Sequence, residues 1–196
     1  MRHTRSLRYS RGMDHTLQLS SARLHLVLAE RQARRQVMTT LTARLACAGA
    51  VRLLDGGNSF DGYGLARTLH QQTPHWQEAL KRVSVARAFT CYQMETLLGQ
   101  TDALPRPTLV LDLLDTFSDE NTPFSERRRL LELCLGHLQR LALAAQVAVS
   151  VCLPPASPQA EMLVVWLTDA VAEAGGEVWR FVTTAAVLQP RLFPEA

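Results

Sequence analysis

The sequence of residues 107–155 is PTLVLDLLDTFSDENTPFSERRRLLELCLGHLQRLALAAQVAVSVCLPP, and this stretch decides the fold class. An apolar run from Thr108 to Leu111 is followed by Asp112, and a second apolar run, from Gln146 to Leu153, is followed by two prolines. Between the runs, an amphipathic pattern of about five helical turns begins near Pro123, a residue type favoured at the first helical position. The stretch therefore predicts a strand, a helix and a second strand, with both strands buried in a parallel sheet.

The position of Asp112 makes it the first candidate for function. An aspartate directly after a buried parallel strand lies at the edge of the sheet where α/β proteins bind their ligands. P-loop ATPases keep the Walker B carboxylate at this position. Asp112 therefore raises the question of whether the chain carries the other parts of an ATPase site.

The rest of the chain continues the alternation of strands and helices. Apolar runs predict strands at 24–28, 51–55, 83–88 and 177–183, and amphipathic segments predict helices at 30–47, 62–71, 74–82, 91–98 and 158–174. The expected helix-capping residues are Asp61, Thr90, Ser157 and, before Pro123, Thr122. The prediction is an α/β fold with a doubly wound, mainly parallel sheet of about six strands and helices on both faces. We expect one core domain at 17–185, between a flexible basic tail at 1–16 and a C-terminal tail at 186–196.

The composition is typical of one soluble domain. The 196 residues are 47% hydrophobic and 20% charged, which provides enough apolar material for a core. No apolar stretch has the length of a transmembrane helix, and the arginine-rich first residues lack the apolar region of a signal peptide. The four cysteines stand singly in predicted helices and strands, so we expect a cytoplasmic protein with neither a zinc site nor a disulfide framework.

Two further segments give the chain a resemblance to a known family. They are VRLLDGGNSF at 51–60 and VSVARAFTCYQM at 83–94, followed by the strand that ends at Asp112. In this order they resemble the ATPase core of RecA-like recombinases, and they are most similar to the recombinase paralogs that serve as recombination-mediator subunits. The resemblance covers roughly residues 23–153 and implies a RecA-like fold.

The stretch that corresponds to the family's phosphate loop is Ala29 to Gln36, and it contains no glycine. In the family this loop is rich in glycine, because its backbone N–H groups must wrap around the phosphates. The resemblance places Arg35 near the lysine that reaches the phosphates, and Gln36 near the hydroxyl that binds magnesium. We expect no conventional ATP site here, although the N-terminus of the following helix leaves some affinity for an anion open.

A second part of the ATPase site is also changed. The resemblance places Gly57 where the family has the glutamate that activates water, so the general base for hydrolysis is missing. The degenerate nucleotide site therefore consists of Arg35, Gln36, Gly57 and the retained Asp112. We expect a pseudo-ATPase with no catalytic residues and no cofactor.

The carboxylates near Asp112 allow two interpretations. Together with Asp115, Asp119 and Glu120, Asp112 could bind magnesium as in two-metal nucleases. Alternatively, Asp112 only ends its strand and the others form a solvated acidic turn before a helix, where negative charge is favourable. We favour the second interpretation and expect no metal site, because no histidine or lysine motif accompanies the cluster.

The basic residues are concentrated at the N-terminus. Residues 1–35 carry eight arginines against Asp14 and Glu30, while the whole chain has a net charge of +3. Arginine suits phosphate contacts because its planar group binds two oxygens at once, so four arginines of the tail are candidates for DNA binding. These candidates are Arg2, Arg5, Arg8 and Arg11. An arginine-biased composition without functional meaning is an equally good explanation.

These observations favour a catalytically inactive RecA-like protein that serves as an accessory or partner-binding subunit in DNA recombination or repair. Its expected partner is a RecA-type ATPase or another repair protein, with DNA contacted through the N-terminus and no contact with a membrane. One alternative is a RecA-derived protein-interaction module without DNA binding, as in a bacterial cell-division inhibitor or a mutagenesis accessory factor. Another is an ATPase with an atypical phosphate loop.

Overall fold

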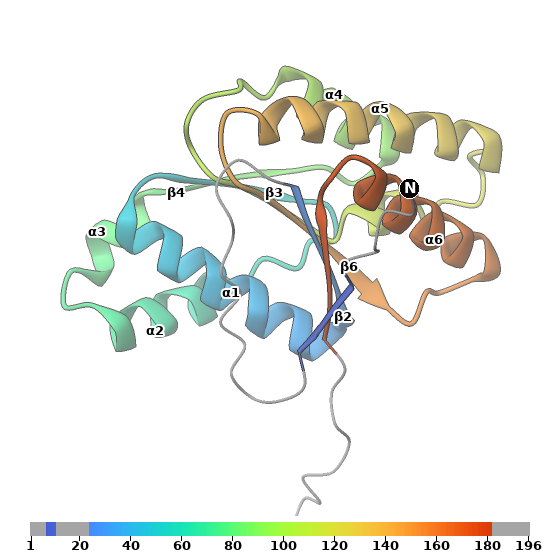
Figure 1. The fold of residues 1–196 in the computed structure, drawn as a ribbon. Helices are drawn as coiled ribbons and strands as arrows, with labels where there is room; N and C mark the ends of the chain where they lie inside the picture. Colours follow the sequence, from blue (N-terminus) through green and yellow to red (C-terminus); the bar gives the residue numbers. More distant parts are fainter. Residues whose placement is uncertain (1–6, 11–23, 182–196) are drawn as a thin grey trace, which may run out of the picture.

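The fold is an α/β sandwich built on a sheet whose strand pairs are all parallel (Figure 1). The computed structural model describes residues 7–10 and 24–181. In this part of the chain the sheet has seven strands in the order β1-β7-β2-β6-β5-β3-β4. This arrangement confirms the predicted α/β fold with a doubly wound parallel sheet.

The elements follow the predicted alternation closely. The strands are β1 (Leu7–Ser10), β2 (Leu24–Glu30), β3 (Val51–Asp55), β4 (Val83–Arg87), β5 (Thr108–Leu111), β6 (Val147–Leu153) and β7 (Glu177–Phe181). The helices are α1 (Arg31–Ala48), α2 (Gly62–Gln72), α3 (Trp76–Lys81), α4 (Cys91–Gln100), the short 3-10 helix η1 (Leu113–Phe117), α5 (Phe124–Ala142) and α6 (Pro158–Glu173).

The additional strand, β1, lies within residues 1–16, where we expected a flexible tail. It pairs with β7 along its whole length, from Leu7 opposite Val178 to Ser10 opposite Phe181. The other residues of that expected tail, and the expected C-terminal tail at 186–196, lie outside the described residues. The sheet consequently has one strand more than the six that the apolar runs predict.

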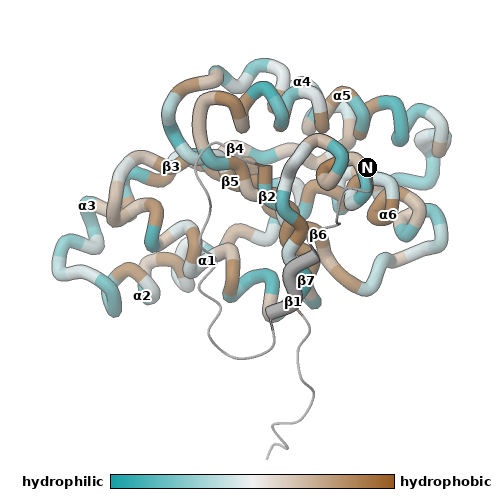
Figure 2. Tube along the Cα trace, in the orientation of Figure 1, coloured by the Kyte–Doolittle hydropathy of each residue, from teal (hydrophilic) through white to brown (hydrophobic). Residues whose placement is uncertain are grey.

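Helices cover both faces of the sheet (Figure 1). One face carries α1, α2 and α3, whose apolar side chains share a core with β3. The other face carries α4, α5 and α6 over the central strands. Figure 2 shows the hydrophobic strands in the middle of the molecule and hydrophilic residues on the outer sides of the helices. None of the helices in the described part of the chain combines the length and the apolar character needed to cross a membrane.

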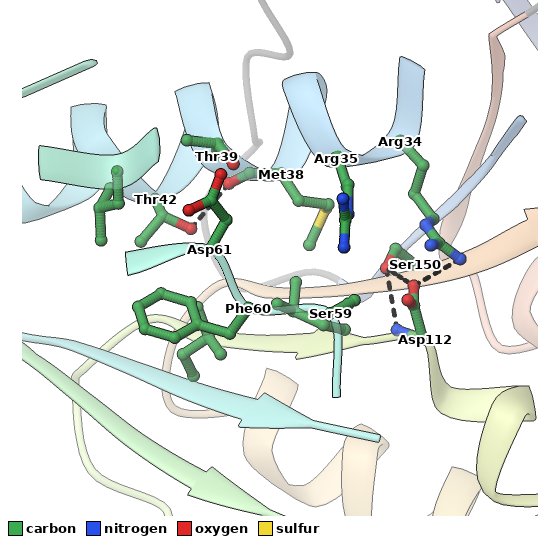
Figure 3. Close-up of a pocket in the computed structure, with 13 residues that line it drawn as sticks. Arg34, Arg35, Met38, Thr39, Thr42, Ser59, Phe60, Asp61, Asp112 and Ser150 are labelled. Atoms are coloured by element: carbon green, nitrogen blue, oxygen red, sulfur yellow. Dashed lines mark hydrogen bonds and ion pairs between the residues drawn. The ribbon is translucent and has the colours of Figure 1, made fainter. Parts of the chain in front are cut away.

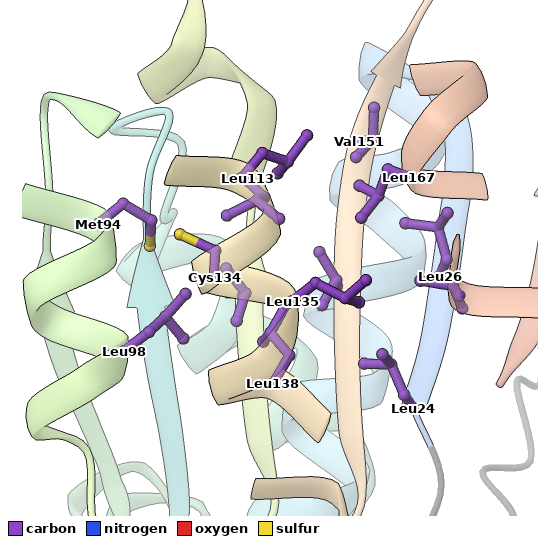
Figure 4. Packing of buried hydrophobic residues seen from close by; sticks show 14 of the residues in the cluster. Leu24, Leu26, Met94, Leu98, Leu113, Cys134, Leu135, Leu138, Val151 and Leu167 are labelled. Atoms are coloured by element: carbon purple, nitrogen blue, oxygen red, sulfur yellow. The ribbon is translucent and has the colours of Figure 1, made fainter. Parts of the chain in front are cut away.

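The predicted central unit, β5–α5–β6, supplies much of the core on the face that α4, α5 and α6 cover (Figure 4). On α5, Cys134, Leu135 and Leu138 are buried at helical spacing and face the sheet. Leu113 from η1 and Leu167 from α6 pack into the same cluster. In β6, Val147, Val149 and Val151 belong to this core while Ala148 belongs to the core on the opposite face, which explains why the strand is apolar almost throughout.

Side chains of the predicted capping residues begin three of the helices. Asp61, Thr90 and Ser157 each accept a hydrogen bond from the backbone N–H three residues further on. Helix α5 differs from its prediction by one position, because Pro123 rather than Thr122 is its N-cap residue. Proline at this position keeps the chain extended before the helix, with ψ of 141°.

Candidate functional site

Parallel strands place their carboxyl ends at one edge of the sheet, and the candidate site lies at this edge. A small pocket with a volume of about 20 Å³ opens between α1, the ends of β3 and β5, and the middle of β6 (Figure 3). Its polar lining comes from separate parts of the chain: Arg34, Arg35, Thr39, Thr42, Ser59, Asp61, Asp112 and Ser150. This is the position where α/β sheets bind ligands.

The junction between β2 and α1 determines the shape of the pocket. β2 ends at Glu30 and α1 begins at the next residue, Arg31, so the stretch expected to correspond to a phosphate loop is strand and helix instead. Arg35 and Gln36 are exposed residues of the first helical turns. A phosphate loop needs several consecutive N–H groups that converge on an anion, whereas a helix directs its N–H groups along its axis.

Arg34 and Asp112 form an ion pair at the floor of the pocket. Arg34 Nη1 lies 2.7 Å from Asp112 Oδ1, and only 3% and 1% of the two side chains is exposed. The Ser150 hydroxyl donates to the same carboxylate oxygen at 3.2 Å, and the backbone N–H of Asp112 donates to Ser150 Oγ at 3.1 Å (Figure 3). The pair thus joins α1, the end of β5 and the middle of β6.

Sequence reasoning named Asp112 but missed Arg34 and Ser150. The signal for Arg34 was present, because Val37, Met38 and Leu41 lie three, four and seven residues further along the same helix face and are buried. Arg35, which the resemblance placed at the lysine position, is exposed and also lines the pocket (Figure 3). Ser150 is an isolated polar residue within an apolar strand, which indicates a buried hydrogen-bond partner.

The environment of Asp112 disfavours its charge. Burial raises the pKa of the Asp112 carboxyl above its ordinary value, and the nearby Asp115 adds to this effect. Arg34 and hydrogen bonds from Ser59 and Ser150 oppose the rise without cancelling it. Asp112 also has a left-handed backbone, with φ of 55°, which aspartate and asparagine tolerate better than most residues.

Gly57 lies against the same carboxylates. An added Cβ at this position would come within 2.6 Å of Asp112 Cβ and within 2.7 Å of both Asp112 Oδ2 and Asp115 Oδ2. A side chain at position 57 therefore requires that these two aspartates move. The position that the resemblance assigns to the water-activating glutamate has no space for one.

Asp55 holds the loop that carries Gly57. Its fully buried carboxylate accepts hydrogen bonds from the backbone N–H groups of Ser59 at 3.0 Å and Phe60 at 3.2 Å. Arg87 Nε on β4 lies 3.3 Å from the same carboxylate. Asp55 was predicted only as the end of a strand, and the structure shows that it shapes one wall of the pocket.

The remaining acidic residues of the turn lie apart from the pocket floor. Asp119 and Glu120 are exposed, and Asp119 Oδ1 accepts hydrogen bonds from the backbone and side-chain nitrogens of Asn121, both at 2.9 Å. These hydrogen bonds lower the pKa of the Asp119 carboxyl. Among the described residues there is no group of three His, Cys, Asp or Glu side chains that could hold a metal ion.

Of the four arginines predicted to contact DNA, Arg2, Arg5 and Arg11 lie outside the described residues. Arg8 lies in β1, which is described by its backbone alone. The structure therefore neither places these side chains near the pocket nor separates them from it.

Comparison with known proteins adds no assignment to this geometry. No protein-family model matches the chain, and no curated protein sequence matches it at a significant level.

Proposed function

We propose that this protein is a catalytically inactive RecA-like subunit that binds a partner protein in DNA recombination or repair. The observation that carries the proposal is the buried ion pair between Arg34 and Asp112, at the point where β2 enters α1 directly. In the family that the sequence resembles, the same point holds the phosphate loop and the magnesium-binding carboxylate.

The arrangement of the sheet supports the RecA-like half of the proposal. β6 lies between β2 and β5, and this order brings the first turns of α1 to the end of the strand that carries Asp112. The two stretches that the resemblance assigns to one nucleotide site are therefore neighbours in space. The resemblance requires this proximity, which every parallel sheet also favours because the carboxyl ends of its strands meet at one edge.

Three features support the absence of hydrolysis. Transfer of a phosphoryl group requires that the phosphates, a magnesium ion and a water molecule are all positioned. At this site helix α1 stands where a phosphate-binding loop would be, and Arg34 forms an ion pair with Asp112, the carboxylate that would otherwise attract magnesium. The space around Gly57 is too small for a side chain that could act as the general base. A protein with this site acts by binding.

Calorimetry with Mg-ATP tests the proposal directly. We expect no heat of binding at nucleotide concentrations up to about 1 mM, which corresponds to a free energy of binding weaker than about 4 kcal/mol. The Arg34→Ala variant, which removes the competing guanidinium, serves as the matched comparison. Micromolar binding of Mg-ATP to the wild-type protein would contradict the proposal.

The second half of the proposal concerns the partner. We expect the purified protein to bind a RecA-type ATPase from the same organism. The affinity for this partner should not depend on whether ATP, ADP or no nucleotide is bound to the present protein. Surface plasmon resonance with the immobilised protein measures this affinity. Binding that depends on nucleotide bound to the present chain would favour the alternative of an ATPase with an atypical site.

A protein-interaction module without DNA contact is the second candidate function. It is favoured by the place of Arg8 in β1, a strand that pairs with β7, because a mobile cationic tail can follow DNA more easily than a strand of the sheet. The two candidates differ in whether single-stranded DNA binds in a salt-dependent manner.

A further inference from the structure

The first turns of α5 and α6 line a second pocket, which the proposed function does not use. Both helices begin at the same end of the molecule, at the right of Figure 1, on the sheet face opposite α1. The pocket lies between these two helix starts and is lined by Phe124 and Arg127 from α5 and by Gln159 from α6. The N-terminus of a long helix carries a partial positive charge, so the two helix starts together favour an anion in this pocket.

Arg127 is a buried cation without an anionic partner. Only 3% of the residue is exposed, and among the described residues no carboxylate forms an ion pair with it. Its Nη1 donates to the backbone carbonyl of Phe117 at 3.0 Å, and its Nη2 donates to the side-chain oxygen of Gln159. Its Nε is buried and has no hydrogen-bond partner. Arginine is rarely buried unless its charge is paired, so the pocket lacks an anionic acceptor.

The free donors of the pocket match an acceptor that has several oxygens. Nε and Nη2 lie on the same edge of the guanidinium group, where two parallel N–H groups can bind two oxygens of one anion. Gln159 supplies one neutral oxygen to this edge, and its side chain is exposed, so an anion can displace it. Further donors come from the first helical turns, because the backbone N–H groups of Phe124, Ser125 and Gln159 have no partner in the described part of the chain.

We propose that this pocket binds a phosphate monoester, held by Nε and Nη2 of Arg127 and by the first N–H groups of α5 and α6. A phosphate monoester carries about −1.5 to −2 charges at neutral pH and three strong acceptor oxygens, which suit a buried guanidinium between two helix N-termini. A phosphodiester within a nucleic acid has a single charge and fewer free oxygens, and therefore matches these donors less well. The exposed carboxylate of Glu120 also lines the pocket and opposes an anion, so the affinity depends on the edge of Arg127.

Calorimetry of the full chain with inorganic phosphate and with glycerol 3-phosphate, at constant ionic strength, tests this proposal. We expect both to bind the wild-type protein with a Kd below about 1 mM. Gln159→Glu places a carboxylate on the same edge of Arg127, and is therefore expected to weaken the binding of both probes by about tenfold or more. The same variant should melt at a higher temperature than the wild type, because the buried charge is then paired. A variant that fails to fold cannot give this combination.

The matched control is Gln71→Glu, which makes the same change of charge at an exposed glutamine of α2, on the opposite face of the sheet. This variant is expected to bind both probes like the wild type. The proposal is wrong if the wild type binds neither probe, if Gln159→Glu binds them unchanged or melts at a lower temperature, or if Gln71→Glu weakens binding equally. It is also wrong if single-stranded DNA without terminal phosphates binds more tightly than glycerol 3-phosphate and loses this binding in Gln159→Glu, because the pocket then recognises a nucleic-acid backbone.

Discussion

Arg34 and Asp112 are the two charged residues whose burial most constrains the site. Taking both from water is costly, and the cost is offset only while the two charges stay together. We expect Arg34→Met, which keeps an unbranched apolar stem and removes the charged group, to lower the free energy of unfolding by about 3–5 kcal/mol at neutral pH. Urea denaturation followed by circular dichroism measures this change.

A double-mutant cycle separates the ion pair from the packing of Arg34. In the Asp112→Asn background, where the carboxylate is already absent, Arg34→Met is expected to cost less than in the wild type. The Asn side chain suits the left-handed backbone at this position, so the comparison leaves the chain geometry intact. Equal costs in both backgrounds would show that the two residues do not interact.

The raised pKa of Asp112 predicts a dependence of stability on pH. Because the folded protein holds this proton more tightly than the unfolded chain, the stabilisation from Asp112 is fully present below the ordinary pKa of 3.8 and is lost as pH rises through the folded value. The free energy of unfolding of the wild type, relative to Asp112→Asn, should therefore fall as the pH rises above the ordinary pKa of 3.8. Urea titrations at several pH values measure the difference, and a rise over this range would contradict the assignment.

Individual residues of the site were less predictable than the strand that carries Asp112. The resemblance named Arg35, but the phase of the helix buries its neighbour Arg34. A shift of one residue around a helix is a rotation of about 100°, which here separates the buried Arg34 at the pocket floor from the exposed Arg35 in the pocket lining. The crowding at Gly57 was not predictable, since it depends on how closely Asp112 and Asp115 approach from another segment.

At the scale of elements, local patterns predicted most of the fold. The apolar runs and the caps at Asp61, Thr90 and Ser157 are signals carried by neighbouring residues, and the structure reproduces them. The strand β1 was missed because Leu7–Ser10 is short and mixed in polarity, and pairs with β7 at the far end of the chain. Pairing between distant segments leaves little trace in a single sequence.

The middle strand β5 gives the sharpest test at this scale. Val110 is fully buried between the two helical layers, so Val110→Asp would place a charge in the core and is expected to prevent folding. Leu104→Asp is the matched control, because Leu104 precedes the same strand but is 49% exposed. We expect the control to melt within a few degrees of the wild type. A folded Val110→Asp protein would contradict the position of β5 in the sheet.

For the whole molecule, the concentration of arginines at the N-terminus is the feature most relevant to DNA. Deleting this segment would also remove β1, so substitution is the better design. If the tail binds single-stranded DNA, the triple variant Arg2→Gln, Arg5→Gln and Arg11→Gln should reduce the slope of log affinity against log salt concentration by about two. Fluorescence anisotropy with labelled DNA at several salt concentrations measures the slope.

A control variant with the same net charge shows whether DNA contacts the N-terminal arginines themselves or is attracted only by the net positive charge of the protein. The variant Arg31→Gln, Arg67→Gln and Arg128→Gln removes three arginines from α1, α2 and α5 instead. It is expected to leave most of the slope unchanged. If the wild-type protein shows no affinity for DNA at low salt, the nucleic-acid part of the proposed function is wrong and the interaction module takes its place.

The close approach of Gly57 to two aspartates also restricts what mutation can do to this protein. A change from glycine to glutamate alone would bring the new side chain into contact with Asp112 and Asp115, and the loop for phosphates would still be missing. Several substitutions and an insertion would have to occur together before any of them improved hydrolysis. Under the proposed function, no single substitution at position 57 restores ATP hydrolysis, because a glutamate there first has to displace Asp112 and Asp115.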